Sequence, residues 1–126
     1  MNQYQMGVVE THFADIVWEN EPLSSTELVS KSFEVLGWKK STTYTVLRRL
    51  CEKGILKNTD AVVTSVISKD QYFEAQSRKY VDDLFGGSLP AFVAAFSSRQ
   101  KLTSKEIDEL RKMIDGQEEA NGEDIS

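Results

Sequence analysis

The sequence predicts a mostly α-helical fold with a small β-hairpin wing, a winged helix-turn-helix followed by further helices, and three observations predict it. Three short segments with helical periodicity, each bounded by start or stop signals, come first in the chain. The extended residues 55–57 and the β-branched stretch 62–67 follow, with turn-forming residues between them. Three helices and a hairpin in this order are typical of the winged helix-turn-helix, whose last helix before the hairpin enters the major groove of DNA.

The length and composition of the chain restrict its class. Its 126 residues, 40% of them apolar and 28% charged, are enough for one domain or for two small ones that share a core. No apolar run approaches the roughly 20 residues that span a bilayer, and the polar start lacks the cationic region of a signal peptide, so we expect a cytoplasmic protein without membrane insertion. A single cysteine and a single histidine exclude an internal disulfide and a tetrahedral zinc site, and we expect no metal and no cofactor.

The first two predicted helices are separated by a break at Pro22. The first covers residues 8–19 and has one apolar face, made of Val9, Phe13, Ile16 and Val17. The second starts at a capping box, in which Ser24 and Glu27 each accept a hydrogen bond from the other's backbone N–H, and it ends at Gly37. Its apolar stripe consists of Leu28, Val29, Phe33 and Leu36.

The third predicted helix has an unusual outward face. We expect Ser41 to cap its N-terminus and Gly54 to follow its last turn. At about 100° per residue, its inward side holds Thr43, Val46, Leu47 and Leu50. Its other side holds hydroxyls and arginines with one carboxylate: Ser41, Thr42, Tyr44, Thr45, Arg48, Arg49 and Glu52. A solvated helix face ordinarily mixes charges of both signs, so this composition favours a binding surface.

Positive charge is concentrated in the same region. The net charge of the whole chain is −5, which by itself disfavours nucleic-acid binding. Residues 38–57 nevertheless contain Glu52 as their only acid, beside six cations: Lys39, Lys40, Arg48, Arg49, Lys53 and Lys57. Because phosphate neutralisation is local, this cationic segment fits a DNA-binding helix, although a solvated charged helix would have the same charge.

We predict that the helix over 41–53 binds double-stranded DNA. Short hydroxyl side chains can approach base edges closely, free N–H groups of a first helical turn bind phosphate, and arginine holds guanine or phosphate with two hydrogen bonds. For Tyr44, packing on DNA and half-burial between helices are both open. The predicted DNA-binding residues are Lys40, Ser41, Thr42, Tyr44, Thr45, Arg48 and Arg49.

The C-terminal half is predicted to form a helical dimerisation region. A helix from Ser68 or Asp70 to about Phe85 comes first, the segment 89–96 is apolar on all sides, and a capping box at 103–106 starts the next helix. We expect a dimer interface made of Leu89, Phe92, Val93, Phe96, Ile107, Leu110 and Ile114. A two-fold dimer would cover these residues and present two recognition helices one turn of DNA apart, and packing onto the winged helix is the alternative.

These observations divide the chain into three parts. We expect a winged helix-turn-helix DNA-binding domain over 1–69, the dimerisation region over 70–115 and an acidic, disordered tail over 116–126. The sequence contains no Ser-His-Asp set, glycine-rich phosphate loop or metal-ligand cluster, so we predict that the protein is not an enzyme. Cys51 is expected to be a small buried hydrophobe, and His12 a surface residue.

Residues 38–56 contain several motifs in a fixed order: a tryptophan, a T-x-x-T pair, an arginine-leucine pair, and a lysine-glycine step before an apolar strand. Together with segments 16–18 and 23–28, they resemble the penicillinase and methicillin-resistance repressor family (BlaI/MecI type), over about 13–114. The resemblance implies a homodimeric repressor of transcription that binds a palindromic operator. By position, it assigns DNA contact to Thr42, Thr45 and Arg49.

The chain departs from this family in two respects. The wing, 58–68, has no cation and carries Asp60, so we expect it to add little affinity for DNA. The asparagine–phenylalanine bond at which some members are cleaved corresponds here to Ala95-Phe96, and the paired cysteines of copper-responsive relatives are absent. The inducer and any upstream sensor are therefore open. A winged-helix protein-interaction module that has lost DNA binding is the alternative function.

Overall fold

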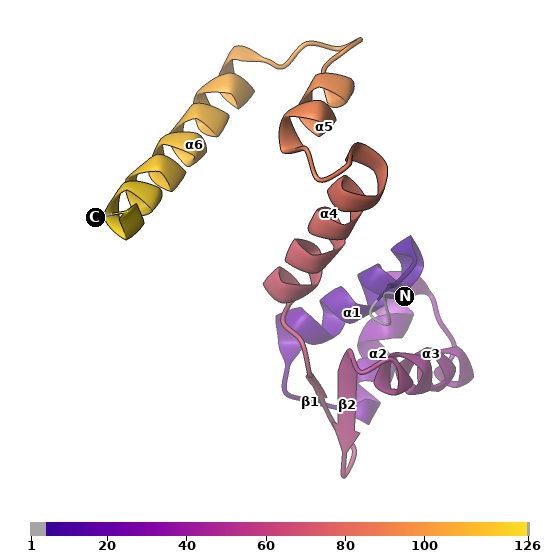
Figure 1. The fold of residues 1–126 in the computed structure, drawn as a ribbon. Coiled ribbons are helices and arrows are strands. Elements are labelled where there is room, and N and C mark those ends of the chain that lie inside the picture. Colours follow the sequence, from indigo (N-terminus) through magenta and orange to yellow (C-terminus); the bar gives the residue numbers. More distant parts are fainter. Residues whose placement is uncertain (1–4, 126) are drawn as a thin grey trace. The chain divides into compact units, whose positions relative to one another are not determined.

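The computed structural model describes residues 5–125, and the side chains of residues 5–121. The chain divides between Tyr80 and Val81 into two compact units, here called the N-terminal unit and the C-terminal unit. The predicted fold class, mostly helical with a small antiparallel sheet, is confirmed (Figure 1). The elements of the N-terminal unit are α1 (Val8–Asn20), β1 (Leu23–Ser24), α2 (Ser25–Leu36), α3 (Lys40–Glu52), β2 (Leu56–Thr59), β3 (Val62–Ser65) and the start of α4 (Lys69–Phe85).

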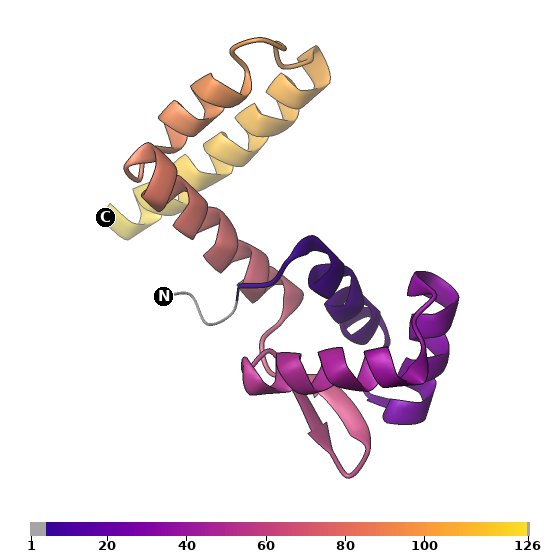
Figure 2. The same cartoon turned by 90° about the vertical axis from the view of Figure 1, so that its right-hand side faces the viewer.

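The sheet is an antiparallel hairpin with one added strand. Its order is β1-β3-β2, with Leu23 opposite Val63 and Leu56 opposite Ser65. Asp60 and Ala61 both have positive φ, 51° and 62°, as a tight two-residue hairpin turn requires. The hairpin extends from the helices of the N-terminal unit in both ribbon views (Figures 1 and 2). The sequence predicted the hairpin but not β1, because two residues carry no periodic signal.

One core lies between the three helices and the sheet. Its largest fully buried side chains come from every layer: Phe13, Val17, Leu28, Leu50, Ile55, Leu56 and Val63. Two tryptophans border this core. The ring of Trp38 stacks on that of Phe13, with 5.3 Å between the ring centroids. The indole N–H of Trp18 donates to the backbone carbonyl of Ile67, with 3.0 Å between nitrogen and oxygen. The start of α4 joins the same core through Tyr72, which is 4% exposed, so the N-terminal unit extends past residue 69.

Two helix faces differ from those predicted. Val9 is 56% exposed and Phe33 is 65% exposed, whereas we expected both to face the core. The buried positions of α2 are Leu28, as predicted, and two serines that were not predicted, Ser25 and Ser32. A serine leaves room for close approach of a neighbouring element, and apolar periodicity cannot identify a buried face made of small polar residues.

The start of the third helix is also corrected. It begins at Lys40 with Lys39 in the N-cap position, two residues before the expected cap, so Ser41 lies inside the first turn. Lys39 makes no side-chain capping bond. Its end is as predicted, because Gly54 has φ 80°, a left-handed conformation that glycine adopts without strain.

The C-terminal unit contains the end of α4, then α5 (Leu89–Phe96) and α6 (Ser104–Ile125). The predicted capping box is present: the backbone N–H of Glu106 donates to Thr103 Oγ1 at 3.1 Å, and that of Thr103 donates to Glu106 Oε1 at 2.8 Å. The expectation of a disordered tail after residue 115 is corrected, since α6 continues through Gly116 to Ile125. Its residues 117–120 are Gln-Glu-Glu-Ala, all good helix formers, which propagate a helix that has already been nucleated.

Candidate nucleic-acid interface

The outer face of α3, defined as the seven predicted DNA-binding residues, is open to solvent. Six of them are exposed and Tyr44 is half-buried: Lys40, Ser41, Thr42, Tyr44, Thr45, Arg48 and Arg49. The inner face of the same helix is buried as predicted, with Thr43 and Leu50 at 0% and Val46 at 8% exposure. Because the inner face is fixed in the core, the outer side chains project from a helix that cannot rotate.

Hydrogen bonds within the N-terminal unit restrain part of this face. Thr45 donates its hydroxyl proton to the carbonyl of Ser41 at 2.9 Å, which leaves its methyl group and the oxygen lone pairs for a partner. The hydroxyl of Tyr44 donates to Ser25 Oγ at 3.4 Å, so the ring bridges α3 and α2. Lys40 Nζ lies 6.0 Å from the centre of that ring. Half-burial between helices, one of the two expectations for Tyr44, is what the structure has.

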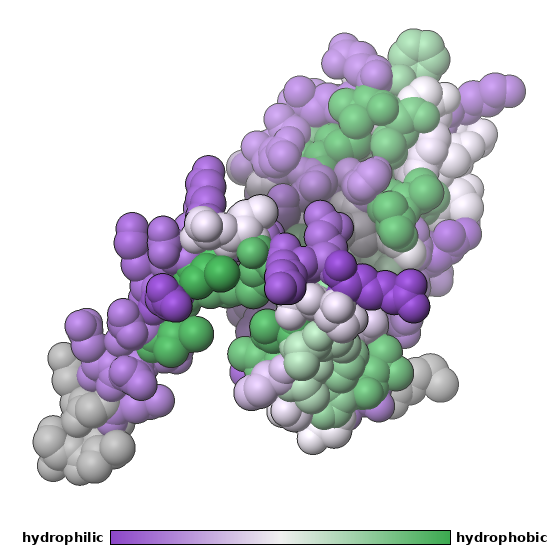
Figure 3. All heavy atoms as spheres, turned by 90° about the horizontal axis from the view of Figure 1, so that it is seen from above, coloured by the Kyte–Doolittle hydropathy of each residue, from purple (hydrophilic) through white to green (hydrophobic). Residues whose placement is uncertain are grey.

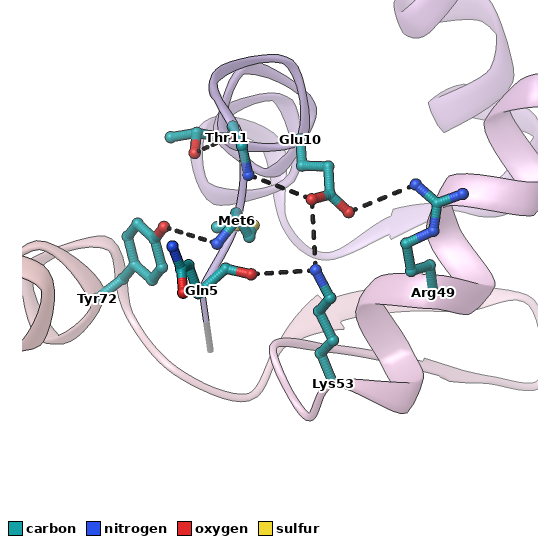
Figure 4. Close-up of polar contacts among 8 residues, drawn as sticks. Gln5, Met6, Glu10, Thr11, Arg49, Lys53 and Tyr72 are labelled. Atoms are coloured by element: carbon teal, nitrogen blue, oxygen red, sulfur yellow. Dashed lines mark hydrogen bonds and ion pairs between the residues drawn. The ribbon is translucent and has the colours of Figure 1, made fainter. Parts of the chain in front are cut away.

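A carboxylate of α1 reaches the C-terminal end of α3 (Figure 4). Glu10 Oε2 lies 3.7 Å from Arg49 Nη1, and Glu10 Oε1 lies 3.3 Å from Lys53 Nζ. Two of the six cations of residues 38–57 therefore have a common anionic partner. This contact was not predicted, because Glu10 is far from α3 along the chain and no local pattern links the first predicted helix to the end of the third.

The hairpin carries one cation. Lys57 is exposed in β2, opposite Thr64 in β3. The stretch 58–68, which was predicted to be the wing, has no cation, but the observed hairpin starts earlier and therefore includes this lysine. A groove of about 360 Å³ runs between α3 and β2, lined by Tyr44, Leu47, Arg48, Cys51 and Asn58. Burial raises the pKa of the Cys51 thiol above its ordinary value of 9.0, although a hydrogen bond with the backbone of Asn58 opposes the shift.

The seven residues predicted for a dimer interface are not buried in the single chain. Leu89, Phe96 and Ile114 are 60%, 65% and 58% exposed, Leu110 is 36% exposed, and Phe92, Val93 and Ile107 are half-buried. A groove of about 290 Å³ within the C-terminal unit is lined mostly by apolar residues, including Leu102 and Met113, which are not among the predicted interface residues. Figure 3 shows uncovered hydrophobic atoms on this unit in the foreground.

Other kinds of site find no support in the described part of the chain. Among the side chains of residues 5–121, no three from His, Cys, Asp or Glu are grouped so that they could hold a metal ion. In the described residues 5–125, no helix is long and apolar enough to cross a bilayer. His12 is exposed, and Cys51 is half-buried rather than fully buried.

Comparisons with known proteins place this surface in context. The sequence profile of the family described as Penicillinase repressor matches residues 6–116. A penicillinase repressor from Bacillus licheniformis is 24% identical over 115 residues, which cover 88% of this chain and 90% of the relative. A penicillinase repressor from Staphylococcus aureus is 25% identical, with 89% and 92% covered. The methicillin resistance regulatory protein MecI from Staphylococcus aureus is 22% identical, with 88% and 94% covered.

Proposed function

Because the chain belongs to the penicillinase repressor family of transcription regulators, we propose that it is a homodimeric repressor that binds a palindromic operator in double-stranded DNA through α3. Members of this family are not enzymes. The observation that carries the proposal is the exposed face of hydroxyls and arginines on a helix whose opposite face is buried in the core. The names of the relatives, two penicillinase repressors and a methicillin resistance regulatory protein, support it.

The outer face of α3 supplies the two kinds of contact that a DNA-binding helix needs. Thr42 and Thr45 present hydroxyl and methyl groups that suit base edges, including the methyl group of thymine. Lys40 and Arg48, together with the N-terminal N–H groups of α3, suit phosphates on either side of a major groove. The outer face of α3 lies within the proposed DNA-binding domain, residues 1–69.

The proposed dimer would cover the apolar residues of the C-terminal unit. Leu89, Phe96 and Ile114 are all more than half exposed, and burying each side chain fully would stabilise the assembly by about 1.5–3 kcal/mol. An exposed apolar surface of this kind marks an association site in a soluble protein. Two-fold symmetry would then match two α3 helices to the two half-sites of a palindrome, with residues 70–115 as the dimerisation region.

The test is a binding titration of the full chain, followed by fluorescence anisotropy, against two labelled duplexes. One duplex is the DNA upstream of the protein's own coding region, and the other has a random sequence of equal length. We expect a preference of at least roughly 10³-fold for the upstream duplex, and an affinity that falls steeply as salt is added. Equal affinity for both duplexes would reject the proposal.

A matched pair of variants tests the role of α3. Arg48→Ala removes a guanidinium from the outer face and is expected to cost about 1–3 kcal/mol of operator binding if Arg48 contacts a base, or to reduce the salt slope by about 1 if it contacts a phosphate. Arg99→Ala removes the same group from an exposed position of the C-terminal unit and is the control. Equal effects of the two variants would show that net charge, not the α3 surface, governs binding.

A second candidate function is a winged-helix module that binds a protein and has lost DNA binding. The low pI of about 4.9 and the neutralisation of Arg49 and Lys53 by Glu10 favour it. In that case the cations of α3 would meet an acidic protein surface, and the anisotropy titration would give background values for both duplexes.

A further inference from the structure

The contact between Glu10 and α3 is a built cluster rather than a chance surface pair. The Glu10 side chain is 17% exposed and lies between the Arg49 guanidinium and the Lys53 ammonium group. Lys53 Nζ also donates to the backbone carbonyl of Gln5 at 3.0 Å, so it is held from two sides (Figure 4). The cluster therefore joins the start of α1 to the end of α3.

The chain fixes the position of the Glu10 carboxylate independently of these cations. The backbone N–H of Gly7 donates to Glu10 Oε1 at 3.2 Å, which caps α1. One residue earlier, the backbone N–H of Met6 donates to the hydroxyl of Tyr72 at 3.2 Å, and Tyr72 is part of the core. The segment before α1 is thus anchored to α4, and the carboxylate is aimed at α3 by the fold.

The two oxygens of Glu10 differ in how they are used. Oε1 accepts the bonds from Gly7 and Lys53. Oε2 is buried and, among the residues that the structure describes, has no hydrogen-bond donor; the nearest cationic atom, Arg49 Nη1, lies at 3.7 Å. The Arg49 side chain itself is 52% exposed. Arg49 is therefore drawn to Glu10 by charge at one nitrogen, while its other N–H donors stay accessible.

We infer that Glu10 is a specificity-determining residue of the α3 surface, which acts by positioning Arg49 and by neutralising Arg49 and Lys53. This inference rests on the proposed DNA-binding function. Binding to arbitrary DNA consists of phosphate contacts, and a cation already paired with a carboxylate gains little from another anion. Base recognition needs two guanidinium donors held in one orientation, and a fixed carboxylate behind Arg49 supplies that orientation. Glu10 thus weakens non-specific binding more than operator binding.

The substitution Glu10→Gln tests this with the least change to the fold. Glutamine keeps the shape and can still accept the capping bond from Gly7, but it carries no charge. The matched control is Glu34→Gln, which removes one negative charge from an exposed position on α2 outside the cluster. Arg49→Ala and the double variant Glu10→Gln/Arg49→Ala complete a double-mutant cycle. Thermal unfolding of each variant checks that the fold is kept, and Glu10→Asp, which withdraws the carboxylate from Arg49, replaces Glu10→Gln if that variant does not fold.

The measurement is anisotropy of the full chain with the upstream and random duplexes over a range of salt concentrations. For Glu10→Gln we expect random-duplex affinity to rise roughly threefold to tenfold, and its salt slope to steepen by about 0.9 for each cation freed. The preference for the upstream duplex should fall, and this fall should be smaller when Arg49 is already alanine, because Glu10→Gln then frees Lys53 alone.

Three outcomes would overturn the inference while leaving the proposed function intact: no change in preference, equal shifts in Glu10→Gln and Glu34→Gln, or a full effect of Glu10→Gln in the Arg49→Ala background. If the wild-type chain itself prefers neither duplex, the proposed function fails instead, and the inference falls with it.

Discussion

The two units differ in how far they bury their apolar side chains. In the N-terminal unit, Phe13, Leu28 and Leu50 are 0% exposed, because three helices and a sheet surround them. In the C-terminal unit, Leu89 and Phe96 are at least 60% exposed. An apolar helix face is removed from water only when another element packs on it, and α5 and α6 are too few to cover each other on all sides. A single chain therefore buries these apolar side chains of the N-terminal unit, whereas it leaves Leu89 and Phe96 of α5 exposed, which is why the proposed dimer is placed there.

The largest expected effect is the loss of a core side chain from the N-terminal unit. Leu50→Ala removes a fully buried side chain from the inner face of α3, and should reduce the free energy of unfolding by about 2–5 kcal/mol. Since its neighbours belong to the same chain, urea denaturation at low and high protein concentration should give the same loss. A loss that depends on concentration would mean that the N-terminal core also needs a second copy.

The next effect tests the C-terminal unit with a pair of matched phenylalanines. Phe96 in α5 and Phe33 in α2 are both 65% exposed, but only Phe96 belongs to the predicted dimer interface. A charge buried in an apolar interface is strongly unfavourable, so Phe96→Asp should raise the dimer dissociation constant by at least about 100-fold, which is roughly 2.7 kcal/mol. Sedimentation equilibrium measures the constant.

Phe33→Asp is the control for that experiment, and should leave the dissociation constant within about twofold of wild type. Dissociation by Phe33→Asp but not by Phe96→Asp would place the interface on α2 instead of the C-terminal unit. A wild-type chain that stays monomeric at all concentrations would reject the dimer itself.

Much of the fold was accessible from the sequence because its signals are local. The capping boxes at Ser24 and Thr103 depend on residues three apart, and the inner face of α3 follows from a single helical period. The same holds for the exposed side of α3, since a helix with one buried face turns the opposite face to solvent. Local pattern was enough to select the candidate surface.

What the sequence left unpredicted depends on contacts between distant residues. Nothing near Glu10 indicates that its carboxylate meets Arg49, and nothing near Tyr72 indicates that its ring closes the core of the N-terminal unit. The prediction for Phe33 was wrong because it took the most apolar face of the helix to be the buried one. In the structure α2 buries Ser32, and Phe33 is exposed. These features are set by how elements pack, which one sequence does not encode in any short window.

A smaller effect concerns a polar group inside the N-terminal core. Thr43 is fully buried, and within the described residues its hydroxyl has no hydrogen-bond partner. Thr43→Val replaces that hydroxyl with a methyl group of similar shape, and should raise the free energy of unfolding by about 1 kcal/mol, since an unsatisfied buried hydroxyl costs about 1–3 kcal/mol. Thr42→Val, on the exposed side of α3, should change it by less than about 0.5 kcal/mol. A loss of stability in Thr43→Val, measured by urea denaturation, would mean that the hydroxyl does have a partner.

The smallest effect is the titration of Cys51, the half-buried thiol between α3 and β2. Burial raises the pKa of this thiol above 9.0, so the folded protein holds the proton more tightly than the unfolded chain does. The corresponding contribution to stability is therefore complete below pH 9.0 and is lost as the pH rises through the raised pKa. Because the thiolate is the reactive form, alkylation by iodoacetamide, followed by mass spectrometry, should be slower in the native protein than in urea at pH 8. A native rate equal to the unfolded rate would mean that the groove leaves the thiol as hydrated as an open surface does.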